Sequence, residues 1–124
     1  MRTAVRADKR ALVESTVRPT AAEAKKFWPI YAAYQRALDN INRRRVVAVE
    51  ALIARDKAPS DLYARMLANE LISTDEAEIK ARRTMHNAVL KALPARRAAR
   101  YLQLESKIRA VQAYDIAVAI PLIE

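Results

Sequence analysis

Residues 20–57 decide the fold, and they read TAAEAKKFWPIYAAYQRALDNINRRRVVAVEALIARDK. Thr20 followed by Glu23 matches a helix capping box, in which each side chain accepts a hydrogen bond from the other residue's backbone N–H. From there apolar residues recur in steps of three, four and seven, the spacing of one helix face. They are Phe27, Tyr31, Tyr34, Leu38, Ile41, Ala48 and Leu52, with Arg45 as the polar insertion. The segment predicts one long amphipathic helix, kinked or split near Pro29 because proline lacks the N–H that a helix interior needs.

Prolines and capping residues divide the rest of the chain into three further helices. The residue before a proline avoids the α region, and proline is tolerated in a first helical turn, so helices are expected to end or begin beside prolines. The prolines outside the long helix are Pro19, Pro59, Pro94 and Pro121. They predict helices over residues 3–16, 61–92 and 95–118, with Ser60 or Asp61 as the N-cap of the second.

Each of these helices has its own apolar spacing. The expected contacts of the first are Val5, Leu12 and Val13. In the second, the residues that recur every seven positions are Ile72, Ile79, His86 and Leu93, and the helix is expected to continue through Ser73-Thr74. The stripe of the last helix is Tyr101, Leu104, Ile108, Val111 and Val118.

These elements predict an all-α fold with a single domain over residues 1–124. A short connection makes the two long helices antiparallel neighbours, so we expect an elongated helical hairpin with two shorter flanking helices. Much of the 52% apolar content is alanine, which packs helices closely but buries little area. A second copy of the chain would bury more apolar area.

The residue types that the sequence lacks exclude several functions. It has no glycine, which phosphate loops, dinucleotide fingerprints and calcium loops need where the backbone turns sharply or meets the ligand. It has no cysteine and one histidine, which leaves no thiolate or His-rich metal site. Asp75, Glu76 and Glu78 are interpreted as a solvated helix face, and His86 as a packed core residue. We therefore expect no catalytic site, no metal and no cofactor, and the protein is expected not to be an enzyme.

The net charge of +9 predicts an acidic partner. Residues 1–58 carry 13 Lys and Arg against 6 Asp and Glu, so most of the excess lies in the first half. The arginines that form the two candidate binding clusters are Arg43, Arg44 and Arg45, and Arg96, Arg97 and Arg100. A merely solubilising face remains the alternative. Arg45 is expected to reach out to solvent or to pair with an acid such as Glu76 across the hairpin.

An aromatic cluster opens the long helix. Phe27, Tyr31 and Tyr34 share one face and are expected to clamp this helix start against the last helix, together with Tyr101. Trp28 points elsewhere, so it is a candidate binding residue if it is exposed.

Two segments resemble a known group of proteins. Residues 27–34, FWPIYAAY, resemble an FWPxYxxY element, and residues 100–122, RYLQLESKIRAVQAYDIAVAIPL, resemble an RYLQxExKxxAxxxYxxAxxIPL ending. The group consists of small exported bacterial helical proteins, and it is distantly similar to the periplasmic LTxxQ (Spy/CpxP-like) family. Thr20 and Glu23 keep part of one LTxxQ motif, and Leu93 keeps the leucine of a second. The resemblance implies a periplasmic location, with a signal peptide absent from the printed residues, and a hairpin that dimerises into a curved basic cradle.

The leading hypothesis is a non-enzymatic periplasmic module that binds unfolded or envelope proteins, as a chaperone or an envelope-stress adaptor. One alternative is a basic nucleic-acid-associated helical protein of the cytoplasm, whose affinity would fall steeply with salt. Another is the sensory module of a metal or stress response. The sequence has no apolar stretch of about 20 residues, so it predicts no membrane span.

Overall fold

The computed structural model describes the backbone of residues 2–55, 57–120 and 122–123, and the side chains of these residues from Asp8 onward. Within them every regular element is a helix: α1 (Arg2–Val17), α2 (Ala21–Ile53), α3 (Asp61–Ala92) and α4 (Ala95–Ala119). The predicted all-α fold is therefore confirmed. The contribution of Val5 and the expected stop at Pro121 lie outside the described residues.

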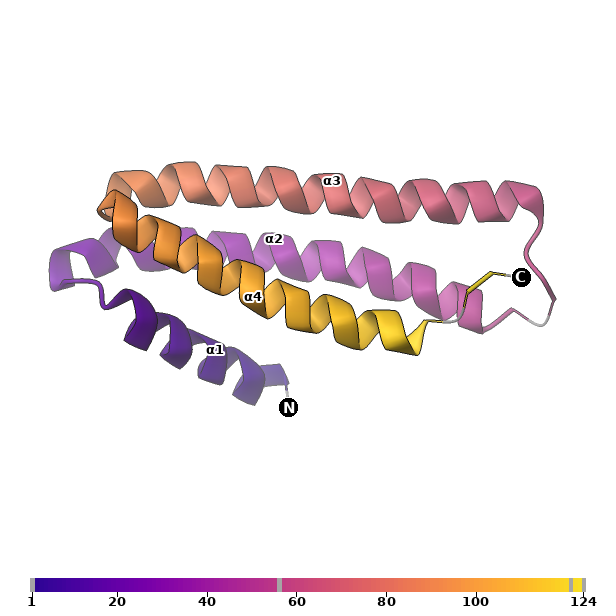
Figure 1. Ribbon diagram of the computed structural model, residues 1–124, viewed down its shortest axis with the longest axis horizontal. Helices are drawn as coiled ribbons and strands as arrows, with labels where there is room; N and C mark the ends of the chain where they lie inside the picture. The colour runs from indigo at the N-terminus through magenta and orange to yellow at the C-terminus, as the bar shows by residue number, and fades with distance from the viewer. Residues whose placement is uncertain (1, 56, 121, 124) are drawn as a thin grey trace.

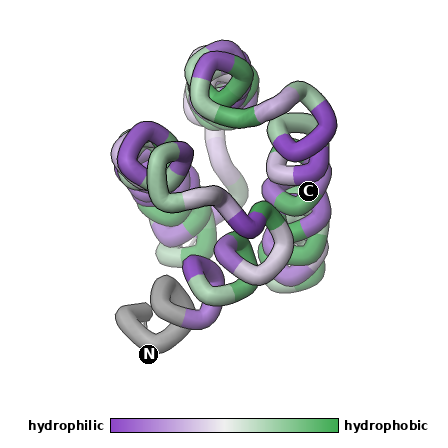
Figure 2. Tube along the Cα trace, turned by 90° about the vertical axis from the view of Figure 1, so that its left-hand side faces the viewer, coloured by the Kyte–Doolittle hydropathy of each residue, from purple (hydrophilic) through white to green (hydrophobic). Residues whose placement is uncertain are grey.

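The two long helices, α2 and α3, form an antiparallel hairpin, and the molecule is elongated along it (Figure 1). Helix α4 runs back alongside the hairpin, and the shorter α1 packs against α4 near the end where the α1–α2 and α3–α4 turns lie. Viewed from that end, α2, α3 and α4 are arranged in a triangle, and α1 lies below them between α2 and α4 (Figure 2).

Local side-chain caps set the helix boundaries. The capping box is present at Thr20, whose hydroxyl accepts from the Glu23 N–H at 3.2 Å while its own N–H donates to the Glu23 carboxylate at 2.9 Å. Ser60 caps α3 by accepting from the Tyr63 N–H at 3.1 Å. Helix α2 ends at Ile53, short of the predicted residue 57.

Two helices continue through residues that could interrupt them. Pro29 is the ninth residue of α2, and the helix is not split there. Proline removes the one hydrogen bond that its N–H would donate to the Lys25 carbonyl, and the helix continues on both sides of it. Helix α3 runs through Ser73 and Thr74, as predicted. The Thr74 hydroxyl donates to the Leu71 carbonyl at 2.7 Å, so the donor of this buried side chain has its hydrogen-bond partner within α3.

The apolar core lies at the end of the molecule where all four helices meet. Its buried members are Val13, Val17, Phe27, Tyr31, Tyr34, Met85, Val89, Ala92, Leu93, Ala98 and Tyr101. The Phe27 and Tyr101 rings meet edge-to-face with centroids 5.1 Å apart, a favoured aromatic geometry. The expected aromatic clamp between α2 and α4 is thus confirmed.

Three predicted stripes are wrong in part. Ile72 and Ile79 are 55% and 65% exposed, because another face of α3 is the buried one, with Thr74, Glu78 and Met85 among its members. Leu93 reaches the core as the extended residue that follows the helix. Val111 and Val118 of α4 are 63% and 68% exposed, since they lie beyond the core. In α1, Val13 is buried but Leu12 is exposed.

Candidate functional site

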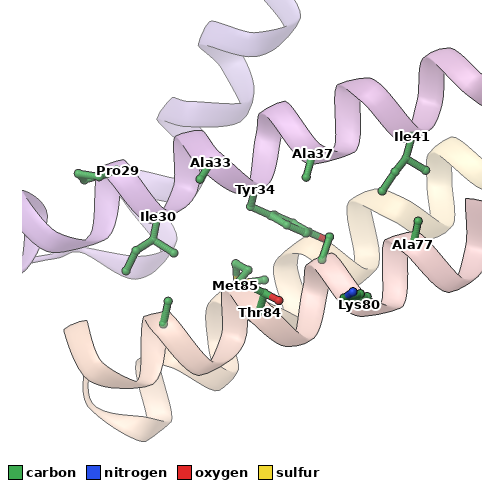
Figure 3. Close-up of a pocket in the computed structure, with 12 residues that line it drawn as sticks. Pro29, Ile30, Ala33, Tyr34, Ala37, Ile41, Ala77, Lys80, Thr84 and Met85 are labelled. Carbon is green, nitrogen blue, oxygen red and sulfur yellow. The ribbon is translucent and has the colours of Figure 1, made fainter.

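An open apolar groove with a volume of about 620 Å³ runs along the α2–α3 hairpin (Figure 3). Its walls are Pro29, Ile30, Ala33, Tyr34, Ala37 and Ile41 from α2, and Ala77, Lys80, Ala81, Thr84, Met85 and Ala88 from α3. The sequence interpretation did not single out this groove.

The groove follows from where alanine falls on the two helices. Residues three, four or seven apart share a helix face, and this spacing relates Ala33 to Ala37 on α2 and Ala77 to Ala81 and Ala88 on α3. Alanine has no atoms beyond Cβ, so these faces leave a trough between the backbones. The buried side chains of Tyr34 and Met85 close its floor. Repeated alanines opposite each other on the two arms were the available sequence signal.

The rim of the groove is basic. Lys80 is the charged residue among those that line it. Lys26 lies one turn before Ile30 on the same side of α2, and it is exposed. One end is crossed by an ion pair between Arg44 of α2 and Glu70 of α3, whose nitrogen and oxygen are 2.6 Å apart. The resulting surface has an apolar floor and positively charged edges.

A buried carboxylate, Glu78, connects three helices behind the groove. It is 3% exposed and pairs with Arg45 of α2 at 2.5 Å, with Arg109 of α4 at 2.6 Å and with Arg82 of its own helix at 3.1 Å. The interpretation of this acidic group as a solvated face is therefore wrong for Glu78. Arg45 does pair across the hairpin, but with Glu78 and Asp75 rather than Glu76, because these two project toward α2.

A second buried carboxylate, Glu105, connects α4 to α1 and α2. It is 3% exposed, and its oxygens accept from Lys9 at 2.9 Å, from Gln35 at 3.0 Å and from the Tyr101 hydroxyl at 2.5 Å. Lys9 and Gln35 lie on other helices, so local spacing could reveal only the contact from Tyr101, four residues earlier on α4. Burial raises the pKa of Tyr101, and the Glu105 charge raises it further, which keeps the hydroxyl protonated as a donor.

The predicted arginine clusters are divided by the fold. Arg44 and Arg45 are engaged in the pairs above, and Arg43 is exposed. Arg97 forms a two-pronged pair with Glu23 at 2.6 and 2.7 Å. Arg96 and Arg100 are exposed, and the Arg100 guanidinium reaches the Thr16 carbonyl at 3.5 Å.

Trp28 and His86 both lie at the edge of the core. Trp28 is half-buried, and the Arg10 guanidinium lies over its ring, 4.3 Å from the centroid. His86 is half-buried, and within the described residues its buried Nδ1 has no hydrogen-bond partner. Neither side chain lines the groove.

Stability is expected to fall in acid, because the fold depends on ionised carboxylates. The hydrogen bond from Arg97, together with the one from the Thr20 N–H, lowers the pKa of Glu23 from 4.5 to about 2. Burial alone would raise the pKa of Glu78, but its pairs with Arg45 and Arg109 outweigh burial and hold that pKa below its usual value. A lowered folded-state pKa means that the stabilisation is complete above the unfolded value and is lost as pH falls toward the folded value.

Urea unfolding at pH 6, 4 and 3 measures this loss. We expect the urea concentration at the unfolding midpoint to decrease as the pH is lowered from 4.5 toward 2. In Glu23→Gln, this decrease should be smaller. Glu50 is exposed, so Glu50→Gln is the matched control, and its urea midpoint should change with pH as the wild type's does. Equal slopes for the wild type and Glu23→Gln would contradict the assignment.

Comparisons with protein-family models, with curated proteins and with solved structures found no match to this chain. Among the described residues, no helix combines the length and apolar character needed to cross a membrane.

Proposed function

We propose that this chain is a non-enzymatic protein-binding module that holds apolar segments of unfolded or envelope proteins, as a chaperone-like protein or an envelope-stress adaptor of the periplasm. The groove carries the proposal. An exposed concave surface whose lining is almost wholly apolar is the usual form of a binding site. The periplasmic location rests on the sequence resemblance.

The arginine pairs favour a protein partner over nucleic acid. Phosphate binding needs guanidinium groups that are free to reach the backbone. Arg44, Arg45 and Arg97, three of the six arginines of the predicted clusters, instead bind carboxylates of this chain. The other three, Arg43, Arg96 and Arg100, stay exposed. The basic surface that remains beside the groove is suited to supplementing apolar contacts with a polypeptide.

Suppression of aggregation of a chemically denatured model protein tests the proposal. The wild type is expected to suppress light scattering at stoichiometric amounts. Ala33→Arg places a long charged side chain at an exposed position of the groove and should weaken holding by about tenfold, equivalent to about 1.4 kcal/mol. Ala68→Arg adds the same side chain at an exposed site of α3 outside the groove, and it should behave as the wild type. No suppression by the wild type, or equal losses in both variants, would refute the proposed function.

A further inference from the structure

We infer that the occupant of the α2–α3 groove is an amphipathic α-helix of about three turns with acidic residues flanking its apolar face. This inference rests on the proposed function and deepens it by naming the class of segment that is bound. Three properties of the groove carry it: the backbone that forms its walls, its length and its charge.

The walls require an occupant whose own backbone is already hydrogen-bonded. Both walls are α-helices, so their N–H and C=O groups are paired within each helix. An extended segment laid between them would bury its peptide groups without partners, which costs free energy. A helical segment satisfies these groups internally and exposes only side chains to the groove.

The dimensions fit one short helix. Ile30 to Ile41 on α2 and Ala77 to Ala88 on α3 each cover twelve residues, and the rise from the first to the last is about 17 Å at 1.5 Å per residue. The two walls therefore match each other in length and match about three helical turns. The alanines at 33, 37, 77, 81 and 88 allow a third helix to approach closely and to place larger apolar side chains in the trough.

The charges select an acidic partner. None of the twelve residues that line the groove is acidic, and Lys80 lies on its α3 edge. On α2, Lys26 and Arg36 are exposed within one turn of lining residues, and the ion pairs found among the described residues include none of these three cations. Two exposed acids of α3, Asp75 and Glu76, also lie within one turn of the lining, and Asp75 is paired with Arg45, so the cations outnumber the acids at the rim. A second copy of the chain would bring an identical basic rim against this one, which disfavours self-association through the groove.

Fluorescence anisotropy with three designed peptides tests the inference on the intact protein. The first is a labelled 16-residue helix with leucine and alanine on one face and glutamate on both flanks. The second replaces every glutamate by lysine, and the third places two prolines in the middle of the first. We expect the glutamate peptide to bind at least about tenfold more tightly than either other peptide at low salt, and to gain helical circular dichroism on binding.

A charge exchange locates the binding. Lys80→Glu should weaken binding of the glutamate peptide about five- to tenfold and strengthen binding of the lysine peptide by a similar factor. Lys107→Glu changes the net charge equally at an exposed site on α4, and it should alter either affinity by less than about twofold. Circular dichroism of both variants verifies that they are folded.

Each other outcome overturns a defined part of the inference. Equal binding of the proline peptide refutes the helical occupant, and equal binding of the lysine peptide refutes the acidic flanks. A concentration-dependent dimer that Ala33→Arg weakens shows that a second copy fills the groove. If the denatured client is held but no peptide binds, the helix inference fails while the proposed function stands.

Discussion

Replacement of Glu78 by Gln is expected to destabilise the protein by about 3–5 kcal/mol, the cost of leaving buried charge without its partner. The substitution keeps the shape of the side chain and removes its charge. Arg45, which is 7% exposed, then faces Arg82 and Arg109 with no buried anion between them. Since a small domain has a total stability of only about 5–15 kcal/mol, the loss should be visible as a large fall in the unfolding midpoint.

The neighbouring glutamate supplies the control. Glu76 lies two residues away on the same helix and is exposed, so Glu76→Gln should change the free energy of unfolding by less than about 0.5 kcal/mol. Urea unfolding monitored by circular dichroism measures both variants. Similar small effects at Glu78 and Glu76 would show that the three-helix network contributes little.

The double variant Arg45→Met/Glu78→Leu separates the charge from the packing. A buried ion pair can often be replaced by apolar residues at little cost, because both desolvation penalties are removed together. We expect this double variant to be more stable than Glu78→Gln alone. If it is less stable, the hydrogen bonds that Arg45 makes to Asn42 and Thr74 carry more of the energy than the charge does.

Replacement of Tyr101 by Ala is expected to cost about 3–5 kcal/mol, the range for removing a buried aromatic side chain. Tyr101 is fully buried, and its ring meets Phe27 at 5.1 Å and Tyr31 at 6.3 Å between centroids. The truncation therefore opens a cavity where α4 joins α2. Thermal and urea unfolding measure the loss, and Tyr114→Ala, at a 69% exposed position of the same helix, should cost less than about 0.5 kcal/mol.

Tyr101→Phe isolates the hydroxyl. It keeps the ring contacts and removes the donor to Glu105, a bond to a charged acceptor that is worth about 1.5–3 kcal/mol. A phenylalanine variant as stable as the wild type would show that Lys9 and Gln35 suffice to satisfy the buried carboxylate. An alanine variant no less stable than the phenylalanine variant would contradict the packing role of the ring.

The two buried carboxylates have a structural consequence for the groove. Glu78 of α3 pairs with Arg109 of α4, and Glu105 of α4 accepts from Gln35 of α2. These contacts hold α4 on one side of the hairpin. Helix α1 in turn packs against α4. The opposite side of α2 and α3 is left uncovered, and it is the side on which the alanines lie.

Local signals in the sequence determined the elements of this fold. A capping box, a serine cap and three prolines act within a few residues of their own positions. The helix starts at Thr20 and Ser60 and the helix boundary at Pro94 could therefore be predicted without any tertiary information. The aromatic cluster was also accessible, because Phe27, Tyr31 and Tyr34 repeat at helical spacing and have few alternatives to burial. Several local patterns nevertheless misled: Ile72 and Ile79 repeat regularly but face solvent.

Only the tertiary structure decided which polar residues are buried and which apolar face stays open. Glu78 and Glu105 resemble any surface glutamate in sequence, and their burial depends on Arg45, Arg109, Lys9 and Gln35, which arrive from other helices. The groove likewise exists only because alanines from α2 and α3 face each other across the hairpin. Helix formation depends on neighbours in the chain, whereas ion pairing and groove formation depend on neighbours in space, and the heptad spacing alone does not specify the rotation of one helix against another.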